Sequence, residues 1–261
     1  MTAALDPRAR IEAAPAEAPH RPFLTAEWRD FLMLSYEVDP RILAPHIPEG
    51  TELDLWRDGA YVSVVGFVFA RPRLFGIPVP LHAEFAEVNL RFYVRRLVNG
   101  AWRRGVVFLR ELVARRAVAL VARLGFGERF GRVPMTYAID RDAVSADGPP
   151  RRVEYAWTHR RRVNRMAAAT AEPPHPPESD SLDEFVVEHY WAYTATRRGP
   201  ALEYLVTHPS WSIAAADSAE FDCDVAAQYG DSFAPFLRGE PAAAFWTNGS
   251  PVRVFRGRRI E

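Results

Sequence analysis

The chain has 261 residues, of which 48% are hydrophobic and 12% aromatic. This composition supports one sizeable buried core and excludes a membrane-embedded protein. Its 33 basic residues balance 33 acidic ones, so no overall field attracts nucleic acid or an anionic membrane surface, and neither is an expected partner. All of the basic residues are arginine and none is lysine.

The N-terminal residues and the single cysteine indicate the compartment. Residues 1–22 lack the apolar core of a signal peptide and are predicted to be a disordered lead-in, followed by one domain over residues 23–261. No apolar run approaches the roughly 20 residues of a membrane-spanning helix. Cys223 has no partner for an intrachain disulfide, which suits a reducing compartment. We therefore expect a cytoplasmic location.

Short apolar or alternating runs broken by Gly and Pro dominate the first part of the domain and predict a mainly β protein. Asp39 and Pro40 predict the capped start of a short helix that ends at Ala44. Residues 60–70 are apolar at both alternating sets of positions, as in a strand buried on both faces. The proline-rich residues 71–82 predict an ordered loop.

Residues 87–96 form the most informative strand pattern. Val88, Leu90, Phe92 and Val94 should face the core, while Glu87, Asn89, Arg91, Tyr93 and Arg95 face the other way. A turn at Gly100–Trp102 leads into a second strand, in which Val107, Leu109, Glu111 and Val113 oppose Val106, Phe108, Arg110 and Leu112.

The following segments alternate between helical and strand patterns. Residues 114–124 have helical periodicity and end at the capping Gly125. Residues 151–163, 184–195 and 201–211 are predicted strands, with a proline-rich surface loop between the first two. Residues 231–237 are predicted to form a short capped helix, and residues 250–260 a final strand.

Several long stretches together resemble one family. They are "FLTAEWRDFLMLSYEVDPRILAPHIPEGTELDLWRDGAYVSVVGF", "FAEVNLRFYVRR", "GVVFLRELVARRAVALVARLGFGERFGRVPM", and "EHYWAYT" through "FDCDVA" to "SPVRVFRGRRI". The chain is similar to the YqjF-like family, domain of unknown function 2071, which is grouped with the acetoacetate-decarboxylase-like superfamily. The resemblance implies an α+β, mainly β fold with a few short helices, whose curved sheets close around an internal cavity.

Acetoacetate decarboxylase uses a lysine amine of depressed pKa to form a Schiff base with a ketone. In this chain the two lysine positions match Glu128 and Arg129, and Gly127 stands where a proline is expected. Arginine cannot replace the amine, because its guanidinium stays protonated and is not an amine nucleophile. We therefore predict that this chain performs no imine chemistry.

Polar residues of the central strands are the candidate site. If the sheet closes, Glu87, Asn89, Arg91 and Tyr93 line the cavity; the alternative is a solvated sheet face. Glu87 matches a cavity carboxylate of the decarboxylase under the resemblance. Arg110 and Glu111 point to opposite faces, so one of them should meet the interior, where an arginine suits a carboxylate ligand and an ion pair to a neighbouring strand is the alternative.

Histidines and aromatic residues extend the candidate site. His82, in the loop before the first of these strands, is a candidate acid or base beside Glu87. His189 and Tyr190 are candidate ligand-binding residues, with ordinary core packing as the alternative. The histidines lack the paired spacing of metal sites, and no dinucleotide, P-loop or nucleophile-elbow motif occurs in a suitable context, so no metal or cofactor is predicted.

Three classes of function fit these observations. The first is a module that binds a small organic keto or carboxylic molecule in a β-lined cavity. The second is a lysine-independent lyase or isomerase, in which Glu87 or His82 moves a proton while Arg91 or Arg110 holds a carboxylate or enolate. The third is a structural or interaction protein with a packed interior. The sequence does not decide whether the protein is an enzyme, nor its oligomeric state.

Overall fold

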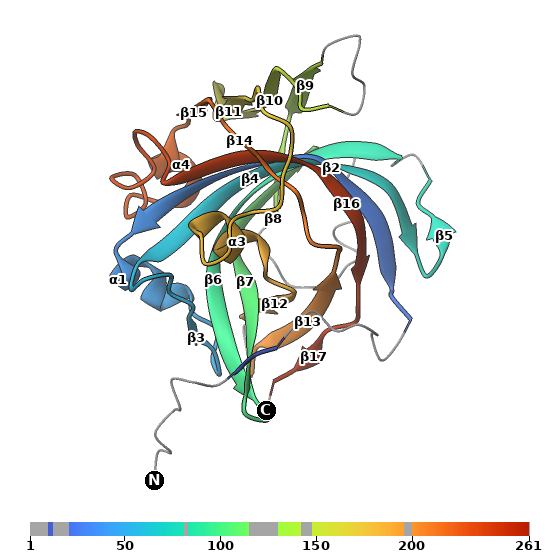
Figure 1. The fold of residues 1–261 in the computed structure, drawn as a ribbon, viewed down its shortest axis with the longest axis vertical. Coiled ribbons are helices and arrows are strands. Elements are labelled where there is room, and N and C mark those ends of the chain that lie inside the picture. The colour runs from blue at the N-terminus through green and yellow to red at the C-terminus, as the bar shows by residue number, and fades with distance from the viewer. Residues whose placement is uncertain are drawn as a thin grey trace.

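The structure is a computed structural model and describes residues 10–12, 21–80, 83–114, 130–141, 148–195 and 200–260. It confirms the predicted class: a mainly β fold with a few short helices, in which curved sheets surround an interior (Figure 1).

The larger sheet curves until it meets itself. Its strands are β1 (Arg10–Ile11), β2 (Leu24–Val38), β3 (Glu52–Leu53), β4 (Ala60–Leu74), β5 (Ile77–Pro78), β6 (Glu84–Val98), β7 (Ala101–Ala114), β8 (Phe130–Val133), β12 (Trp191–Thr194), β13 (Leu202–Thr207), β14 (Ala214–Ala215), β16 (Ala243–Val254) and β17 (Arg258–Arg259). Hydrogen-bonded neighbours run β7-β12-β13-β16-β2-β4-β6, and β6 pairs again with β7, which closes the ring. The ring is uneven, because β13 and β16 share only two register pairs.

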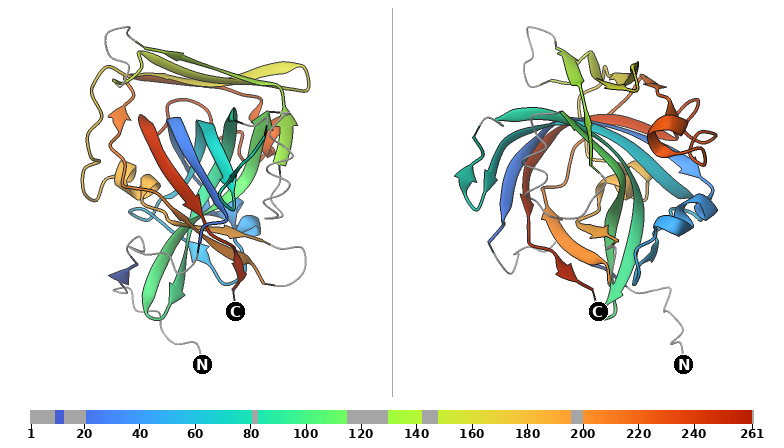
Figure 2. Two further views of the ribbon diagram at one scale, coloured as in Figure 1. Left: turned by 90° about the vertical axis from the view of Figure 1, so that its right-hand side faces the viewer. Right: turned by 180° about the vertical axis from the view of Figure 1, so that it is seen from behind.

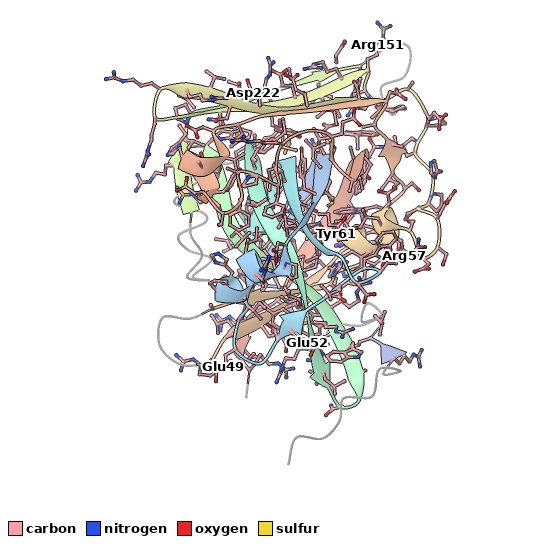
Figure 3. All side chains as sticks on the ribbon, turned by 90° about the vertical axis from the view of Figure 1, so that its left-hand side faces the viewer. Glu49, Glu52, Arg57, Tyr61, Arg151 and Asp222 are labelled. Atoms are coloured by element: carbon pink, nitrogen blue, oxygen red, sulfur yellow. The ribbon has the colours of Figure 1, made fainter. Side chains whose placement is uncertain are left out.

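A smaller antiparallel sheet lies across one end of this ring (Figure 2). It contains β9 (Met135–Asp140), β10 (Arg152–His159), β11 (Arg162–Ala169) and β15 (Ser218–Asp222). Figure 3 shows side chains filling the layer between the two sheets, with Arg151 and Asp222 marking the smaller one. Tyr155 and Met166 of this sheet pack closely against Gly66 of β4, where a Cβ atom would lie 2.6 Å from the Tyr155 ring.

The central strands of the ring are buried on both faces. One face, including Val64 and Leu90, packs with Tyr155 and Trp157 of the small sheet. The other face, including Val65 and Phe67, points into the ring. This arrangement confirms the prediction for residues 60–70 and explains why β4 is apolar throughout.

Strands β6 and β7 form the predicted hairpin, but a bulge changes the predicted facing of β7. Arg91 pairs with Phe108 and Leu90 with Arg110, so Leu109 is an extra residue in the ladder. A bulge shifts the alternation by one. Val106 and Phe108 therefore share the inner face with Glu111, whereas the sequence alternation had placed them on opposite faces.

The helices are short. In the described part of the chain they are α1 (Pro40–Leu43), followed by a 3-10 turn, η1 (Ala44–His46), then α3 (Leu182–Val187) and α4 (Val225–Tyr229). The Asp39 side chain accepts a hydrogen bond from the Arg41 amide, which confirms the predicted cap of α1.

Four predictions for the second half were wrong, and local chemistry explains the first three. Residues 151–163 are not one strand but a hairpin, because Arg160 and Arg161 adopt left-handed φ angles of 46° and 68°. Residues 184–187 are helical, because Ser181 accepts from the Glu184 amide and caps α3.

The other two corrections lie nearer the C-terminus. Residues 231–236 form consecutive turns and not a regular helix, since Pro235 lacks the amide hydrogen that a continuing helix needs. The expected final strand over residues 250–260 is divided between the end of β16 and β17.

The remaining predictions concern the lead-in, one loop and one helix. Within the predicted lead-in, Arg10 and Ile11 pair with Ala101 and Trp102 of β7. The loop predicted over residues 71–82 begins instead as the end of β4 and a short pairing with β5. Residues 115–124 and the motif from Gly125 to Arg129 lie outside the described residues.

Within the described ranges, no helix is both long and apolar enough to cross a membrane.

Candidate functional site

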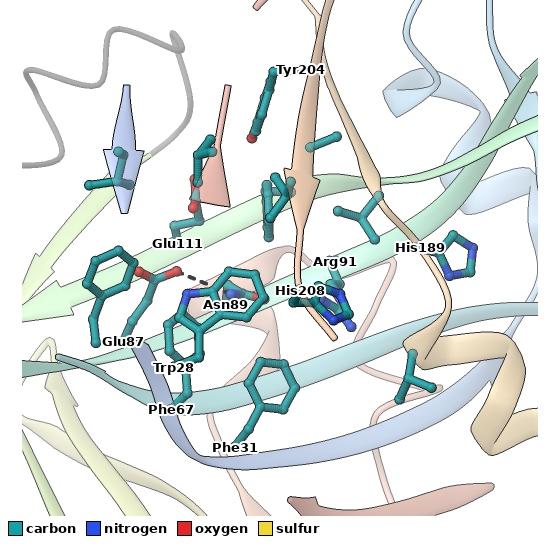
Figure 4. A pocket seen from close by; sticks show the side chains of 18 of the residues that line it. Trp28, Phe31, Phe67, Glu87, Asn89, Arg91, Glu111, His189, Tyr204 and His208 are labelled. Atoms are coloured by element: carbon teal, nitrogen blue, oxygen red, sulfur yellow. Dashed lines mark hydrogen bonds between the residues drawn. The ribbon is translucent and has the colours of Figure 1, made fainter. Parts of the chain in front are cut away.

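A cavity of about 100 Å³ lies inside the ring (Figure 4). Its walls come from β2, β4, β6, β7, β12, β13, β16, the end of α3 and the segments that follow α3 and β13. One water-sized group needs roughly 10–15 Å³ of cavity volume. The cavity therefore accommodates a molecule of about seven to ten non-hydrogen atoms.

One wall of the cavity is polar and comes from β6 and β7. Glu87, Asn89 and Arg91 alternate along β6, and Glu111 of β7 pairs directly with Asn89. All four are buried, with exposed fractions of 3 to 8%. The Asn89 side-chain amide donates to Glu87 Oε1 at 3.2 Å. The polar face of the predicted strand is therefore interior rather than solvated.

Arg91 carries the cation on this wall. Its Nη2 donates to the Val186 carbonyl oxygen at 3.2 Å and lies 4.0 Å from Met33 Sδ. The end of α3 supplies that carbonyl, so the Ser181 cap indirectly positions the guanidinium. Among the described residues, no side chain forms an ion pair with Arg91, and its Nε has no hydrogen-bond partner. A buried charge without a counter-charge is costly, by several kcal/mol in proteins.

The facing wall is aromatic. Phe31 stacks on Phe67 at 5.5 Å between ring centroids, and Trp211 lies 4.6 Å from Phe31. His208 stacks on Trp211 at 4.5 Å, and its Nδ1 is 2.9 Å from the Pro209 carbonyl oxygen, a contact that leaves Nε2 as an acceptor. Burial lowers the pKa of His208 to about 4, so the ring is neutral near pH 7. The aromatic rings of this wall provide an apolar surface next to the Arg91 guanidinium.

His189 lies at the edge of the cavity in a buried polar pair. Its Nε2 is 3.3 Å from Asp54 Oδ2, and Asp54 also accepts from Arg104 Nε at 2.6 Å. Burial, reinforced by the Arg104 charge, lowers the pKa of His189 to about 3. Although burial alone would raise it, the pKa of Asp54 is lowered by the hydrogen bond from His189 and the charge of Arg104. The imidazole is therefore neutral and the carboxylate ionised at pH 7.

The buried neutral His189 predicts a pH-dependent stability. The unfolded chain binds a proton on this histidine below about pH 6.5, whereas the folded chain does so only near pH 3. Its contribution is complete above pH 6.5 and decreases as the pH falls. By proton linkage, the wild type should lose about 1–2 kcal/mol more unfolding free energy than His189→Gln between pH 7 and pH 5. Urea unfolding of both chains at these pH values measures the difference; equal losses would contradict the assignment.

The structure gathers only part of the predicted site. Glu87, Asn89, Arg91, Glu111 and His189 line the cavity. Tyr93 packs behind it, 4.7 Å from the His189 ring, with its hydroxyl 2.5 Å from Ser63 Oγ. Tyr190 lies in a separate small cluster with Leu205 and Phe255, and its hydroxyl donates to Glu188 at 2.6 Å.

One further predicted residue lies away from the cavity, and another is not tested. The strand alternation around the bulge turns Arg110 to the outer face of β7, away from the cavity. His82 lies outside the described residues.

Other residues in or next to the cavity had little or no signal in the sequence. Asp54 is a single acidic residue after a two-residue strand, and its contact with His189 joins positions far apart in the chain. The sequence does not distinguish Trp28 and Trp211 from ordinary core aromatic residues. In the structure, Trp28 Nε1 has no hydrogen-bond partner among the described residues. His208 precedes a proline in a loop, a pattern that does not distinguish an exposed histidine from one at a cavity.

No group of three or more His, Cys, Asp or Glu side chains in the described part of the chain is arranged to hold a metal ion.

Solved structures with the same fold are acetoacetate-decarboxylase-like. Acetoacetate decarboxylase from Legionella pneumophila aligns with a TM-score of 0.62 at 12% identity, covering 95% of this chain and 92% of that one. An acetoacetate decarboxylase-like enzyme from Sphingomonas wittichii RW1 gives 0.63 at 15% identity, covering 95% and 99%. The enduracididine biosynthesis enzyme MppR in complex with pyruvate gives 0.64 at 14% identity, covering 96% and 97%. These likenesses show the fold alone.

The sequence itself identifies the family. The chain is 29% identical over 195 residues to the uncharacterized protein YqjF of Bacillus subtilis (strain 168), covering 73% of this chain and 75% of that protein. The model of the DUF2071 family, described as an uncharacterized conserved protein, matches residues 25–251. The resemblance noted in the sequence is thus confirmed, and the chain belongs to the DUF2071 family.

Proposed function

We propose that this protein binds a small organic carboxylate, such as a keto acid, in the ring cavity, with the ligand carboxylate on Arg91. The observation that carries the proposal is the buried Arg91 guanidinium, whose Nε has no partner in the described part of the chain. A carboxylate would supply the missing charge and accept from Nε in a charge-assisted hydrogen bond.

The rest of the cavity suits the same ligand class. Phe31, Phe67 and Trp211 offer apolar contacts to a short carbon chain, and the cavity volume of about 100 Å³ matches a small keto acid. Asn89 Oδ1, an acceptor that has no hydrogen-bond partner among the described residues, would accept from a hydroxyl of the ligand such as that of its enol form. The pyruvate bound to MppR, a protein of similar fold, supports this class as the first to test.

Native mass spectrometry of the protein purified from its own host tests the proposal without choosing a ligand. A stoichiometric adduct that is absent from the denatured mass, and whose mass fits a small carboxylate, is the expected result. A protein that carries no adduct and also shows no saturable binding of pyruvate, 2-oxobutyrate or acetoacetate would contradict it.

A second candidate is a lysine-independent lyase or isomerase, favoured by the carboxylate of Glu87 on the cavity wall. Glu87 would remove a proton next to the carbonyl of a ligand held by Arg91. Glu87→Gln keeps the side-chain volume and removes the base. Proton exchange of bound 2-oxobutyrate with deuterated water, followed by NMR, should stop in this variant if Glu87 is the base. A binding module would show no exchange in either chain and only an altered affinity.

The absence of lysine predicts a specific negative result. Imine formation needs a primary amine, and because the chain contains no lysine side chain, only its N-terminal amine is of this type. Incubation with pyruvate or acetoacetate and sodium borohydride should leave the intact mass unchanged, while a lysine-dependent acetoacetate decarboxylase treated in parallel gains the reduced adduct. A reduced adduct on this chain would overturn the exclusion of Schiff-base chemistry.

A further inference from the structure

A second cavity, of about 70 Å³, lies on the opposite face of β7 from the ring cavity. It is lined by His46, Leu109, Arg110, Gln228, Tyr229 and Phe233. Arg110 of β7 pairs with Leu90, whereas Arg91 of β6 pairs with Phe108. The two arginine side chains therefore point to opposite faces of the sheet.

Helix α4 supplies the polar roof of this cavity. The Asp224 side chain caps the helix by accepting from the Ala227 amide at 3.2 Å. The Asp224 amide in turn donates to Asn164 Oδ1 at 2.9 Å, which attaches the helix to β11. Gln228 and Tyr229, in the last turn of the helix, are therefore held in place by the main fold and not by a free loop.

The cavity contains an unusual concentration of unsatisfied polar atoms. Gln228 is only 4% exposed, yet neither its Nε2 nor its Oε1 has a hydrogen-bond partner among the described residues. In the same set of residues, Tyr229 Oη and Arg110 Nε are also buried without a partner. Leaving a buried polar group unpaired costs about 1–3 kcal/mol, so such groups rarely gather in one place unless something else pairs with them.

The hydrogen-bonding capacity of these side chains defines the kind of ligand that would bind them. Arg110 and Tyr229 are donors, and the Gln228 amide provides both a donor and an acceptor. Burial raises the pKa of Tyr229 well above 10, so its hydroxyl remains a donor. Arg110 is half-buried, and no acidic side chain of the described part of the chain forms an ion pair with it, so a bound anion would provide a counter-charge. The Gln228 acceptor additionally requires a donor on the bound molecule.

We infer that the cavity beside Arg110, Gln228 and Tyr229 is a second binding site, for a small carboxylate that bears a hydroxyl group. The carboxylate accepts from Arg110 and Tyr229, and the hydroxyl exchanges hydrogen bonds with the Gln228 amide. At roughly 10–15 Å³ for each water-sized group, the cavity admits about five to seven non-hydrogen atoms, the size of glycolate or lactate. Leu109 and Phe233 bound its apolar side.

The test is an NMR titration of the full chain with sodium glycolate, read at the side-chain amide signal of Gln228. Loss of one amide signal in Gln228→Leu assigns that signal. Sodium acetate, which lacks only the hydroxyl, is the matched ligand, and sodium chloride at equal ionic strength controls for screening. We expect a saturable shift with glycolate, at least tenfold weaker binding of acetate, and no saturable shift with chloride.

Three variants separate this site from the ring cavity. Arg110→Gln should weaken glycolate binding at least tenfold, and Tyr229→Phe, which preserves packing, should weaken it severalfold. Arg91→Gln should leave the Gln228 titration unchanged, so this site can fail or succeed independently of the proposed keto acid site. No saturable shift with glycolate, or an unchanged affinity in both Arg110→Gln and Tyr229→Phe, would mean that the cavity holds water only and would overturn the inference.

Discussion

Arg91→Gln should weaken the binding of pyruvate or another small keto acid by about 10- to 100-fold in isothermal titration. A hydrogen bond to a charged group contributes about 1.5–3 kcal/mol, and tenfold in affinity corresponds to about 1.4 kcal/mol. Glutamine keeps a neutral amide near the position of Arg91 Nε but is too short to reach the Val186 carbonyl oxygen, which Nη2 now contacts at 3.2 Å. The variant therefore removes the charge together with that one contact.

The same substitution should not destabilise the ligand-free protein. The wild-type chain bears the desolvation cost of a buried guanidinium for which the described residues offer no counter-charge, and removing the charge relieves that cost. Arg95→Gln is the matched control, since Arg95 lies on the same strand but pairs with Glu52 at 2.7 Å outside the cavity. An unchanged keto acid affinity in Arg91→Gln, or an equal loss in Arg95→Gln, would contradict the role of Arg91.

Glu203→Gln should lower the free energy of unfolding by about 3 kcal/mol, the largest stability effect that we expect from a single charge. The Glu203 side chain is fully buried and pairs with Arg96 at 3.3 Å, Arg103 at 3.1 Å and Arg258 at 2.9 Å. Its Oε1 also accepts from the Tyr193 hydroxyl at 3.2 Å. These partners lie on β6, β7, β17 and β12, so one carboxylate of β13 connects the strands around the part of the ring with the fewest ladder pairs.

The expected loss of unfolding free energy is large because Glu203 is buried and two of its arginine partners are mostly buried. Removing the carboxylate leaves the Arg96 and Arg103 guanidiniums, whose side chains are 16% and 14% exposed, without their shared counter-ion. Glu220→Gln is the matched control, because Glu220 pairs with Arg165 and Arg152 through side chains that are 43–44% exposed, and exposed pairs contribute about 0–1 kcal/mol. Urea unfolding of both variants measures the contrast. A loss below about 1 kcal/mol in Glu203→Gln would show that the carboxylate does not hold the ring together.

The sequence predicts the central strands well because their periodicity reports burial directly. Residues 87–96 alternate without interruption, so the inner face of β6 follows from the pattern. The pattern fails on β7, where one extra residue at Leu109 reverses the alternation, and nothing in the residue types of that strand marks the bulge. For the same reason, the sequence could assign one of Arg110 and Glu111 to the interior but not say which.

The second half is less predictable because local signals compete there. The run from Glu184 to Val187 is apolar enough for a strand, yet the Ser181 cap and the Glu184 side chain, which accepts from the Asp180 amide at 2.7 Å, begin a helix. The contact between Asp54 and His189 joins residues 135 positions apart. Contacts between residues so far apart in the chain depend on how the strands close into a ring. Hydrophobic periodicity and secondary-structure propensity carry no information about this closure.

The most direct test of the proposed function is a crystal structure of the protein grown with pyruvate. We expect the ligand inside the ring, with a carboxylate oxygen within about 3 Å of Arg91 Nε, a charge-assisted distance, and its methyl group against the Phe31 and Trp211 rings. Two results would contradict the proposal that Arg91 binds the carboxylate of a ligand. One is a cavity that contains only water at saturating pyruvate, and the other is an Arg91 guanidinium that pairs with Glu87 or Glu111 instead of a ligand.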